Sequence, residues 1–226
     1  MSYYDEKTLE YIENNKLGLN DYFNFDCNQC GSCCRNRKPE NSIILSGLDI
    51  FRIAKHFNTT TDSILQKHTE VYIGSDSKLP IVAIKQRTGD NTCPFLRQGK
   101  CLCHMSKPIN CALYPLARAL STTGEYTYFK QDISCGNNQK IKVKDWLSIW
   151  GIQELDSACK AWGQCIIDLA TYIIQIRDRQ KLELTQHAIY GALYVSYDTT
   201  KGEYTEQLNK NMQLLQAVLP GFRVKN

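Results

Sequence analysis

The chain has 226 residues, of which 22% are charged, and its 27 basic and 23 acidic residues give a formal net charge of +4. This length supports a sizeable hydrophobic core without disulfides. The cations form no long basic run, which argues against nucleic-acid binding. No stretch reaches the roughly 18 to 20 consecutive apolar residues that a membrane span needs, so we also expect no membrane insertion.

Helix starts are recognisable in the first third of the chain. Residues 1–20 predict an amphipathic helix that ends near Gly18. Ser46-Gly47-Leu48-Asp49 has the form of a capping box before a helix through Phe57, and Thr59-Thr60-Thr61-Asp62 repeats this pattern before a second, short helix. Because the first 20 residues are polar and acidic and lack the apolar run of a secretory signal, we expect a cytoplasmic protein.

Strand patterns come next, followed by helical ones. Val71–Ile73 and Ile81–Ile84 predict a hairpin, and Tyr126–Phe129 alternates as a strand after Gly124. From Lys144 onward the pattern is helical, over residues 152–179, 185–198 and 203–219. The sequence therefore predicts an α+β fold over residues 1–226 as a single compact unit. Within it we expect a small cysteine-rich core of short strands and helices at 20–140 and a mainly helical C-terminal region at 141–226.

The most informative feature is the clustering of the eleven cysteines. Cys27, Cys30, Cys33 and Cys34 lie within eight residues, and a second set spans residues 93–111. Thiolates at this density repel one another unless a cation neutralises them, so they predict a metal-binding core. The spacing C-x2-C-x2-C opens ferredoxin cluster motifs and favours an iron–sulfur cluster, most simply 4Fe-4S. Cys33 and Cys34, as neighbours on extended backbone, are expected to point to opposite sides and to serve two metal centres or two irons.

The second cysteine set carries a resemblance to a known family. Cys93 precedes Phe95-Leu96, and the element from Cys101 through Pro108 to Cys111 runs into Tyr114-Pro115-Leu116. With the first four cysteines, these elements resemble, over about residues 25–136, the CxxCxxCC family (YkgJ-like) of zinc- or iron-chelating domains. The resemblance implies eight metal ligands, which are Cys27, Cys30, Cys33, Cys34, Cys93, Cys101, Cys111 and Cys135. The chain departs from the family at Leu102-Cys103-His104 and at Ala112, where relatives often have arginine.

The sequence does not decide between zinc and an iron–sulfur cluster. Eight thiolates satisfy two tetrahedral zinc ions, or one cluster and one structural ion, and zinc and iron–sulfur centres select the same soft ligands. The second set lacks the C-x2-C knuckles of common zinc sites, which favours iron–sulfur. A disulfide framework is disfavoured by the odd number of cysteines and the lack of a secretory signal. The cations of Arg35-Asn36-Arg37-Lys38 are placed to offset thiolate charge.

The remaining cysteines and histidines are expected to be mainly structural. Cys103 is predicted to be a spare or supporting thiol and His104 a surface or hydrogen-bonded side chain, with ligation left open for both. Cys159 and Cys165 do not share a helix face and are expected in the core. The same expectation of a structural role holds for His56, His68 and His187.

These residues are compatible with two main functions. The first is a non-enzymatic protein that holds a metal or carries electrons, with a metal ion or cluster as its ligand and a metal acceptor as its partner. The second is implied by the resemblance, since this domain also occurs in flagellin lysine N-methylases: methyl transfer from S-adenosylmethionine to a protein substrate. A third alternative is partner docking through the C-terminal aromatics, although Trp146, Trp150 and Trp162 are better explained as core residues.

Overall fold

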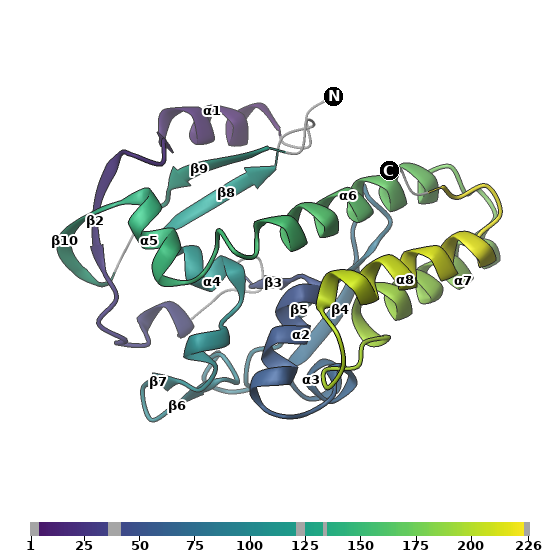
Figure 1. Cartoon of the computed structure of the whole chain (residues 1–226), viewed down its shortest axis with the longest axis horizontal. Helices are drawn as coiled ribbons and strands as arrows, with labels where there is room; N and C mark the ends of the chain where they lie inside the picture. The colour runs from purple at the N-terminus through teal and green to yellow at the C-terminus, as the bar shows by residue number, and fades with distance from the viewer. Residues whose placement is uncertain (1–4, 36–41, 121–124, 133–134, 224–226) are drawn as a thin grey trace.

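The computed structural model describes residues 5–35, 42–120, 125–132 and 135–223, and its fold is α+β (Figure 1). The helices are α1 Glu6–Asn14, α2 Gly47–His56, α3 Thr61–His68, α4 Ile109–Leu113, α5 Val143–Ile149, α6 Asp156–Ile173, α7 Arg179–Tyr190 and α8 Tyr204–Val218, with 3-10 turns η1 Ser32–Cys34 and η3 His104–Ser106 and a π-helical turn η4 Gly191–Val195. The strands are β1 Lys16–Leu17, β2 Tyr22–Asp26, β3 Ile44–Leu45, β4 Thr69–Ile73, β5 Pro80–Ile84, β6 Leu96–Arg97, β7 Lys100–Cys101, β8 Leu116–Leu120, β9 Tyr126–Lys130 and β10 Asn137–Lys142. Every strand pair in this described part is antiparallel.

The N-terminal helix is shorter than predicted. Asp5 caps α1 by accepting a hydrogen bond from the backbone N–H of Thr8 (2.8 Å). The helix ends at Asn14 because the next residues pair with β9, Lys16 opposite Phe129 and Leu17 opposite Tyr128. The prediction of a helix over residues 1–20 is therefore wrong beyond Asn14, and residues 1–4 lie outside the described part. Strands β1, β9 and β8 form one sheet, which confirms the predicted strand at Tyr126–Phe129; Gly124, predicted to precede it, lies outside the described residues.

Strands β2 and β10 pair with each other at one end of the molecule (Figure 1), and in sequence they flank the segment that carries most of the cysteines. Strand β2 alternates between exposed and buried residues, and it buries Phe23 and Phe25 against the indole of Trp146 in α5, with ring centroids 6.2 and 5.3 Å apart. The register sets Asn137 opposite Asp26. The backbone just after β2 and the backbone just before β10 are thereby held at the same place.

The two predicted capping signals differ in accuracy. At α2 the capping box is confirmed, because the side chain of Ser46 accepts from the N–H of Asp49 and that of Asp49 accepts from the N–H of Ser46. At α3 the cap is one residue later than predicted, since Thr60 accepts from the N–H of Ser63 and no capping box forms. The predicted hairpin is confirmed: β4 and β5 pair, with Ile73 opposite Pro80, and β3 joins the other edge of β5.

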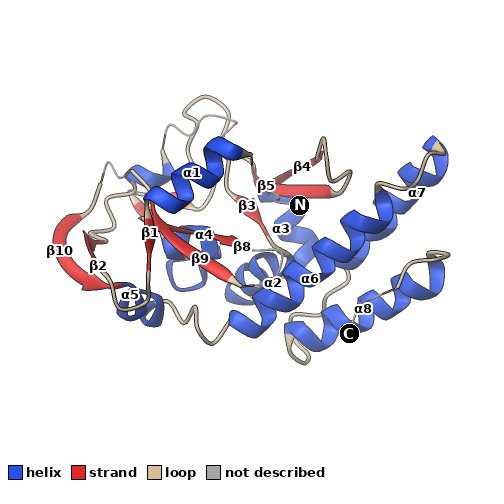
Figure 2. Cartoon of the chain, turned by 90° about the horizontal axis from the view of Figure 1, so that it is seen from above, coloured by secondary structure: helices blue, strands red, loops and turns tan. Residues whose placement is uncertain are grey.

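In the C-terminal region α6 packs against α2, α7 and α8, while α7 also packs against β5 and the turn η4 packs against α2 and α3 (Figure 2). The predicted helix over residues 152–179 is too long at both ends, since α6 covers only Asp156–Ile173 and Asp178 caps a new helix by accepting from the N–H of Lys181 (2.6 Å). Helix α7 starts earlier than the predicted residue 185 and passes directly into η4. The side chain of Asn211 in α8 donates to the carbonyls of Ala192 and Ser196 at this irregular end.

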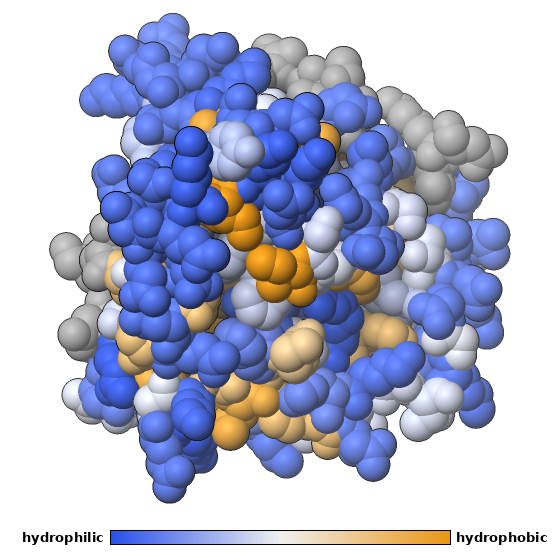
Figure 3. Space-filling view, turned by 60° about the vertical axis from the view of Figure 1, so that its left-hand side comes forward, coloured by the Kyte–Doolittle hydropathy of each residue, from blue (hydrophilic) through white to orange (hydrophobic). Residues whose placement is uncertain are grey.

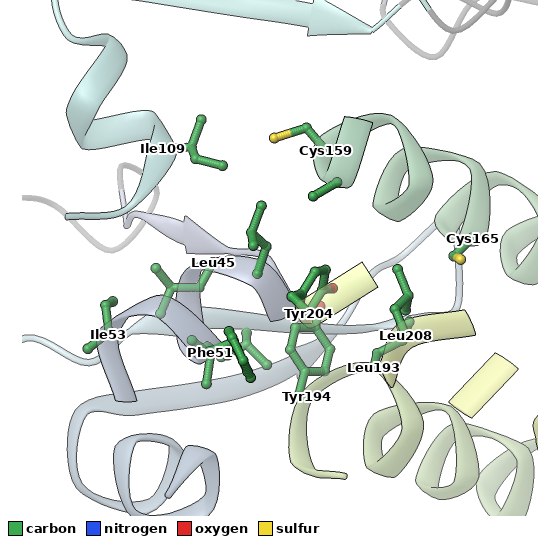
Figure 4. Close-up of a cluster of buried hydrophobic side chains, with 14 of the residues drawn as sticks. Leu45, Phe51, Ile53, Ile109, Cys159, Cys165, Leu193, Tyr194, Tyr204 and Leu208 are labelled. Carbon is green, nitrogen blue, oxygen red and sulfur yellow. The ribbon is translucent and has the colours of Figure 1, made fainter. Parts of the chain in front are cut away.

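One cluster of buried side chains runs from Phe23 to Phe222, on both sides of the predicted division at residue 140. Figure 4 shows part of it, where Phe51 of α2 lies beside Tyr204 of α8 with ring centroids 5.8 Å apart. Trp146 is buried and Trp150 and Trp162 are partly buried against this cluster, so these aromatics belong to the core as expected. Among the described helices, none is both long and apolar enough to cross a membrane.

Candidate metal centre

Nine thiols line a single cavity that contains about 70 Å³ of open space. They are Cys27, Cys30, Cys33, Cys34, Cys93, Cys101, Cys103, Cys111 and Cys135. The structure thus brings together all eight cysteines that the sequence predicts as ligands, and it adds Cys103. All eleven cysteines lie in the described part of the chain, and none of them forms a disulfide bond. Metal ligation by the eight stays a prediction, but their convergence on one cavity is a property of the fold.

Separate segments deliver these thiols to the cavity. Cys27 follows β2 directly, and Cys135 is separated from β10 by Gly136 alone. The pairing of these strands therefore brings both thiols to the same edge of the cavity. Gly136 makes this approach feasible, because it has φ +91° and a side chain there would overlap the ring of Phe25. Cys101 ends the short strand β7, and Cys111 lies in α4. The backbone N–H of Cys93 donates to the carbonyl of Cys34 (2.8 Å), which joins the first cysteine element to the second.

The geometry of Cys33 and Cys34 corrects the sequence prediction. Gly31 adopts a left-handed conformation (φ +72°), and the next three residues form the 3-10 turn η1 instead of extended backbone. The sulfurs of Cys33 and Cys34 lie 3.9 Å apart instead of on opposite sides of the chain. The expectation that these two side chains point to opposite sides is therefore wrong, while their service to two metal centres or to two irons stays a prediction.

Two further thiols, Cys101 and Cys103, form a close pair deep in the cavity, with their sulfurs 3.7 Å apart. Cys103 is only 1% exposed. A hydrogen bond from the Cys103 thiol lowers the pKa of Cys101 to about 7, and the same contact together with burial raises the pKa of Cys103. Because it contacts a predicted ligand and lines the cavity, Cys103 lies where a supporting thiol is expected, and its ligation stays open.

Hydrogen bonds also adjust the other thiols. The thiol of Cys30 donates to the hydroxyl oxygen of Ser32 (3.2 Å), and hydrogen bonding with the side chain and backbone of Ser32 lowers the pKa of Cys30. A hydrogen bond with Cys34 lowers the pKa of Cys93. The hydrogen bond with Cys33 lowers the pKa of Cys34, but the contact with Cys93 and burial together outweigh this effect and raise that pKa to about 12.

A buried lysine supplies positive charge that the sequence analysis did not foresee. Lys107 is 7% exposed, and its Nζ lies 3.3 Å from the ring centroid of Trp150. Burial lowers the pKa of Lys107, while the charges of nearby thiols, that of Cys27 first, oppose this shift. Of the stretch that was predicted to offset thiolate charge, only Arg35 lies in the described part, and it is exposed. The sequence feature that could have identified Lys107 is its position directly before Pro108, within the element from Cys101 to Cys111.

Lys107→Met is expected to raise the pKa of Cys101 by roughly one unit in the metal-free protein, because a nearby cation stabilises the thiolate. The pH dependence of alkylation of Cys101, followed by peptide mass spectrometry, measures this shift. Lys100→Met is the matched control, since Lys100 adjoins Cys101 in sequence but is exposed, so solvent and salt screen its charge. Equal shifts in the two variants would contradict a specific role for Lys107.

The histidines lie around the centre in different ways. His104 lines the thiol cavity and packs edge-on against Trp150 with ring centroids 5.1 Å apart, and burial lowers its pKa. Its ligation stays open. The cavity lining does not include His56, His68 or His187. Cys159 and Cys165 are 3% and 6% exposed, which confirms that they are core residues.

The wall of the cavity is largely apolar. Phe25, Ile84, Phe95 and Tyr114 contribute to it, and the hydroxyl of Tyr114 lies 3.8 Å from the sulfur of Cys135. Figure 3, with the side of the molecule that carries β2 and β10 turned forward, shows apolar side chains gathered in the middle of a mainly hydrophilic face. Apolar walls limit water access to a metal and so influence its redox potential and its ligand exchange.

The thiols surround the cavity without closing on one point. Within residues 5–35, 42–120, 125–132 and 135–223, no three side chains of His, Cys, Asp or Glu are close enough together to hold a single metal ion. The sulfurs instead approach one another in pairs, at 3.9 Å for Cys33 and Cys34 and at 3.7 Å for Cys101 and Cys103.

Comparison with known proteins agrees with this site. Residues 26–145, more than half of the chain, match the model of the CxxCxxCC family, described as a "putative zinc- or iron-chelating domain". No curated protein and no solved structure gives a significant match. The matched range contains all nine cavity cysteines as well as Lys107 and Tyr114. The chain is therefore a metal-binding member of the CxxCxxCC family.

Proposed function

We propose that the protein holds an iron–sulfur cluster of the 4Fe-4S type in the nine-thiol cavity and acts as an electron-carrying or metal-donating module. The observation that carries this proposal is the arrangement of nine thiols around one open space. A cluster contains several irons and inorganic sulfides, so its thiolate ligands stand around a volume instead of around a point. The cavity offers about 70 Å³ of such space.

The composition of the surroundings also supports a cluster. Among the residues that line the cavity, the titratable side chains other than the thiols and Tyr114 are Lys107 and His104. Soft thiolates without carboxylates select iron–sulfur clusters, zinc or copper(I) over magnesium or calcium. The positive charge of Lys107 and the hydrogen bond of Ser32 with Cys30 are of the kind that adjusts the stability and potential of a cluster.

Zinc is the second candidate, and a specific observation favours it. Two thiolates on one tetrahedral zinc ion stand about 3.8 Å apart, given a zinc–sulfur distance of about 2.3 Å. The pairs Cys33–Cys34 and Cys101–Cys103, at 3.9 and 3.7 Å, have this spacing. Zinc would give the protein a structural or zinc-transferring role without electron transfer.

Methyl transfer from S-adenosylmethionine receives less support from the geometry. The usual methyltransferase site lies at the carboxyl ends of a parallel sheet. The described strands form antiparallel sheets of two or three strands, so the methyl donor would have to bind at the metal itself or on the helical C-terminal region. A protein substrate would then have to reach the same place.

Anaerobic purification followed by analysis of iron, zinc and acid-labile sulfide tests the proposal. We expect iron and sulfide in near-equal amounts and a broad visible absorption that bleaches on reduction. Zinc without sulfide would overturn the cluster and support the second candidate. Titration with S-adenosylmethionine is expected to leave the visible spectrum unchanged, whereas a saturable change would favour the methyltransferase alternative.

A further inference from the structure

A second pocket, of about 320 Å³, lies outside the thiol cavity. None of the residues that line it also lines the thiol cavity. Leu45, Ile81, Ile109, Ile166 and Trp162 make much of its wall apolar. In Figure 4 the side chains of Ile109 and Cys159, both part of this wall, point toward one another from α4 and α6. Its volume lies at the lower end of the range for small-molecule pockets, roughly 300 to 1,000 Å³.

The pocket contains a half-buried cation, Arg118 of β8. Its guanidinium carbon lies 4.0 Å from the ring centroid of Tyr126, which holds the planar group by stacking. The hydroxyl of Tyr126 donates to the carbonyl of Cys159 (3.2 Å) and so fixes the ring. The Nη1 atom of Arg118 is buried and has no hydrogen-bond partner. A buried polar nitrogen without an acceptor is unusual and requires an explanation.

The acidic groups near Arg118 are already engaged. Asp49 also lines the pocket, but its carboxylate accepts from the N–H of Ile109 (2.8 Å) and from the N–H and hydroxyl of Ser46. Asp156 pairs with Lys160 instead, with 3.2 Å between their charged atoms. In the described part of the chain, no carboxylate forms an ion pair with Arg118.

Cys159 does not supply the missing negative charge. Its thiol lines the pocket near the guanidinium, but burial raises the pKa of Cys159, so the neutral thiol persists at pH 7. A guanidinium in an apolar wall therefore has one unused donor and no counter-charge from the described chain. Such a group binds a carboxylate more strongly than an exposed arginine does, because both partners are desolvated and the hydrogen bond is charge-assisted.

We propose that this pocket binds a small molecule that has a carboxylate group and an apolar body. The carboxylate would accept from Nη1 of Arg118, and the apolar body would contact the aliphatic side chains and Trp162. This site is separate from the metal centre, so the inference does not depend on which metal the thiols hold.

Calorimetric titration of the metal-loaded full chain tests this inference. The probes are hexanoate, octanoate and 4-phenylbutyrate, each compared at pH 7 with its neutral amide. We expect saturable one-site binding of at least one acid and weaker binding of its amide, on the order of 10- to 100-fold, because the amide has no charge for the guanidinium. Arg118→Met is expected to remove the preference for the acid, and Arg118→Lys to reduce it, since lysine keeps the charge but lacks the planar fork.

Arg179→Met is the matched control, because the side chain of Arg179 is 92% exposed and lies outside the pocket. This variant should bind the acids as the unmodified protein does. Metal content and circular dichroism of Arg118→Met, compared with the unmodified protein, show whether the variant is folded. Absence of saturable binding for all three acids, equal binding of acid and amide, or full retention of the acid preference in folded Arg118→Met would each overturn the proposal.

Discussion

Replacing Cys93 with serine is expected to remove the bound metal and to destabilise the protein by about 4 kcal/mol, the value for a ligand present at 1,000 times its Kd. Cys93 joins the two cysteine elements, since its N–H donates to the carbonyl of Cys34 (2.8 Å) and its thiol lines the cavity. Serine is a harder and much less acidic ligand than cysteine, so it does not replace a thiolate. Metal content per folded chain and urea unfolding measure the two effects.

Cys165→Ser is the control for this prediction. Cys165 is 6% exposed in α6 and belongs to the core cluster, so its replacement is expected to cost about 1 to 3 kcal/mol for a buried hydroxyl that lacks a partner. Its metal content should equal that of the unmodified protein. Similar metal loss in the two variants would show that metal is lost through general unfolding, which would contradict a ligand role for Cys93.

Gly47→Ala is expected to destabilise the protein by about 3 kcal/mol, because the added methyl has no room. Gly47 begins α2, and a methyl group there would overlap the carbonyl oxygen of Leu193 and lie 2.8 Å from the ring of Trp162. The carbonyl belongs to η4, so it cannot move without shifting backbone. The midpoint of urea unfolding, at unchanged m-value, measures the loss.

Gly191→Ala provides the matched comparison. Gly191 is also helical (φ −56°), but a methyl group there would meet no atom within 4 Å. Alanine is expected to stabilise this site by about 0.4 to 1 kcal/mol, since it restricts the unfolded chain without strain. If Gly47→Ala does not destabilise the protein relative to Gly191→Ala, the prediction is contradicted, and α2 and η4 can separate at little cost.

Local signals predicted several elements well because their cause is local. The Ser46–Asp49 capping box starts α2 where expected, and the β-branched runs around residues 71 and 81 form the expected hairpin. Strand β10 could not be read from the sequence, since Asn137–Lys142 is polar and its first residues are exposed. It becomes a strand because β2 supplies the buried face and the hydrogen-bond partners, and this pairing joins residues more than 100 positions apart.

The candidate site shows the same division between local and long-range information. Spacing and family resemblance identified eight of the nine cavity cysteines, because the order and spacing of ligand cysteines along the chain are visible in the sequence. The role of Cys103 was left open and Lys107 was not identified, since only packing against Cys101 and Trp150 directs these two side chains to the cavity. The turn η1 reversed the expected orientation of Cys34, because the left-handed Gly31 ended the extended backbone. The predicted boundary at residue 140 stays a prediction.

The pairing of β2 with β10 also sets an order of events during biosynthesis. All nine cavity cysteines lie between these two strands in the chain. The first quartet leaves the ribosome more than 100 residues before β10, which at 5 to 20 residues per second corresponds to roughly 10 s. During that interval the early thiols have neither their later partners nor the apolar wall around them. We therefore expect metal insertion to follow translation of the β10 segment, and a nascent chain stalled earlier to expose the quartet to oxidants.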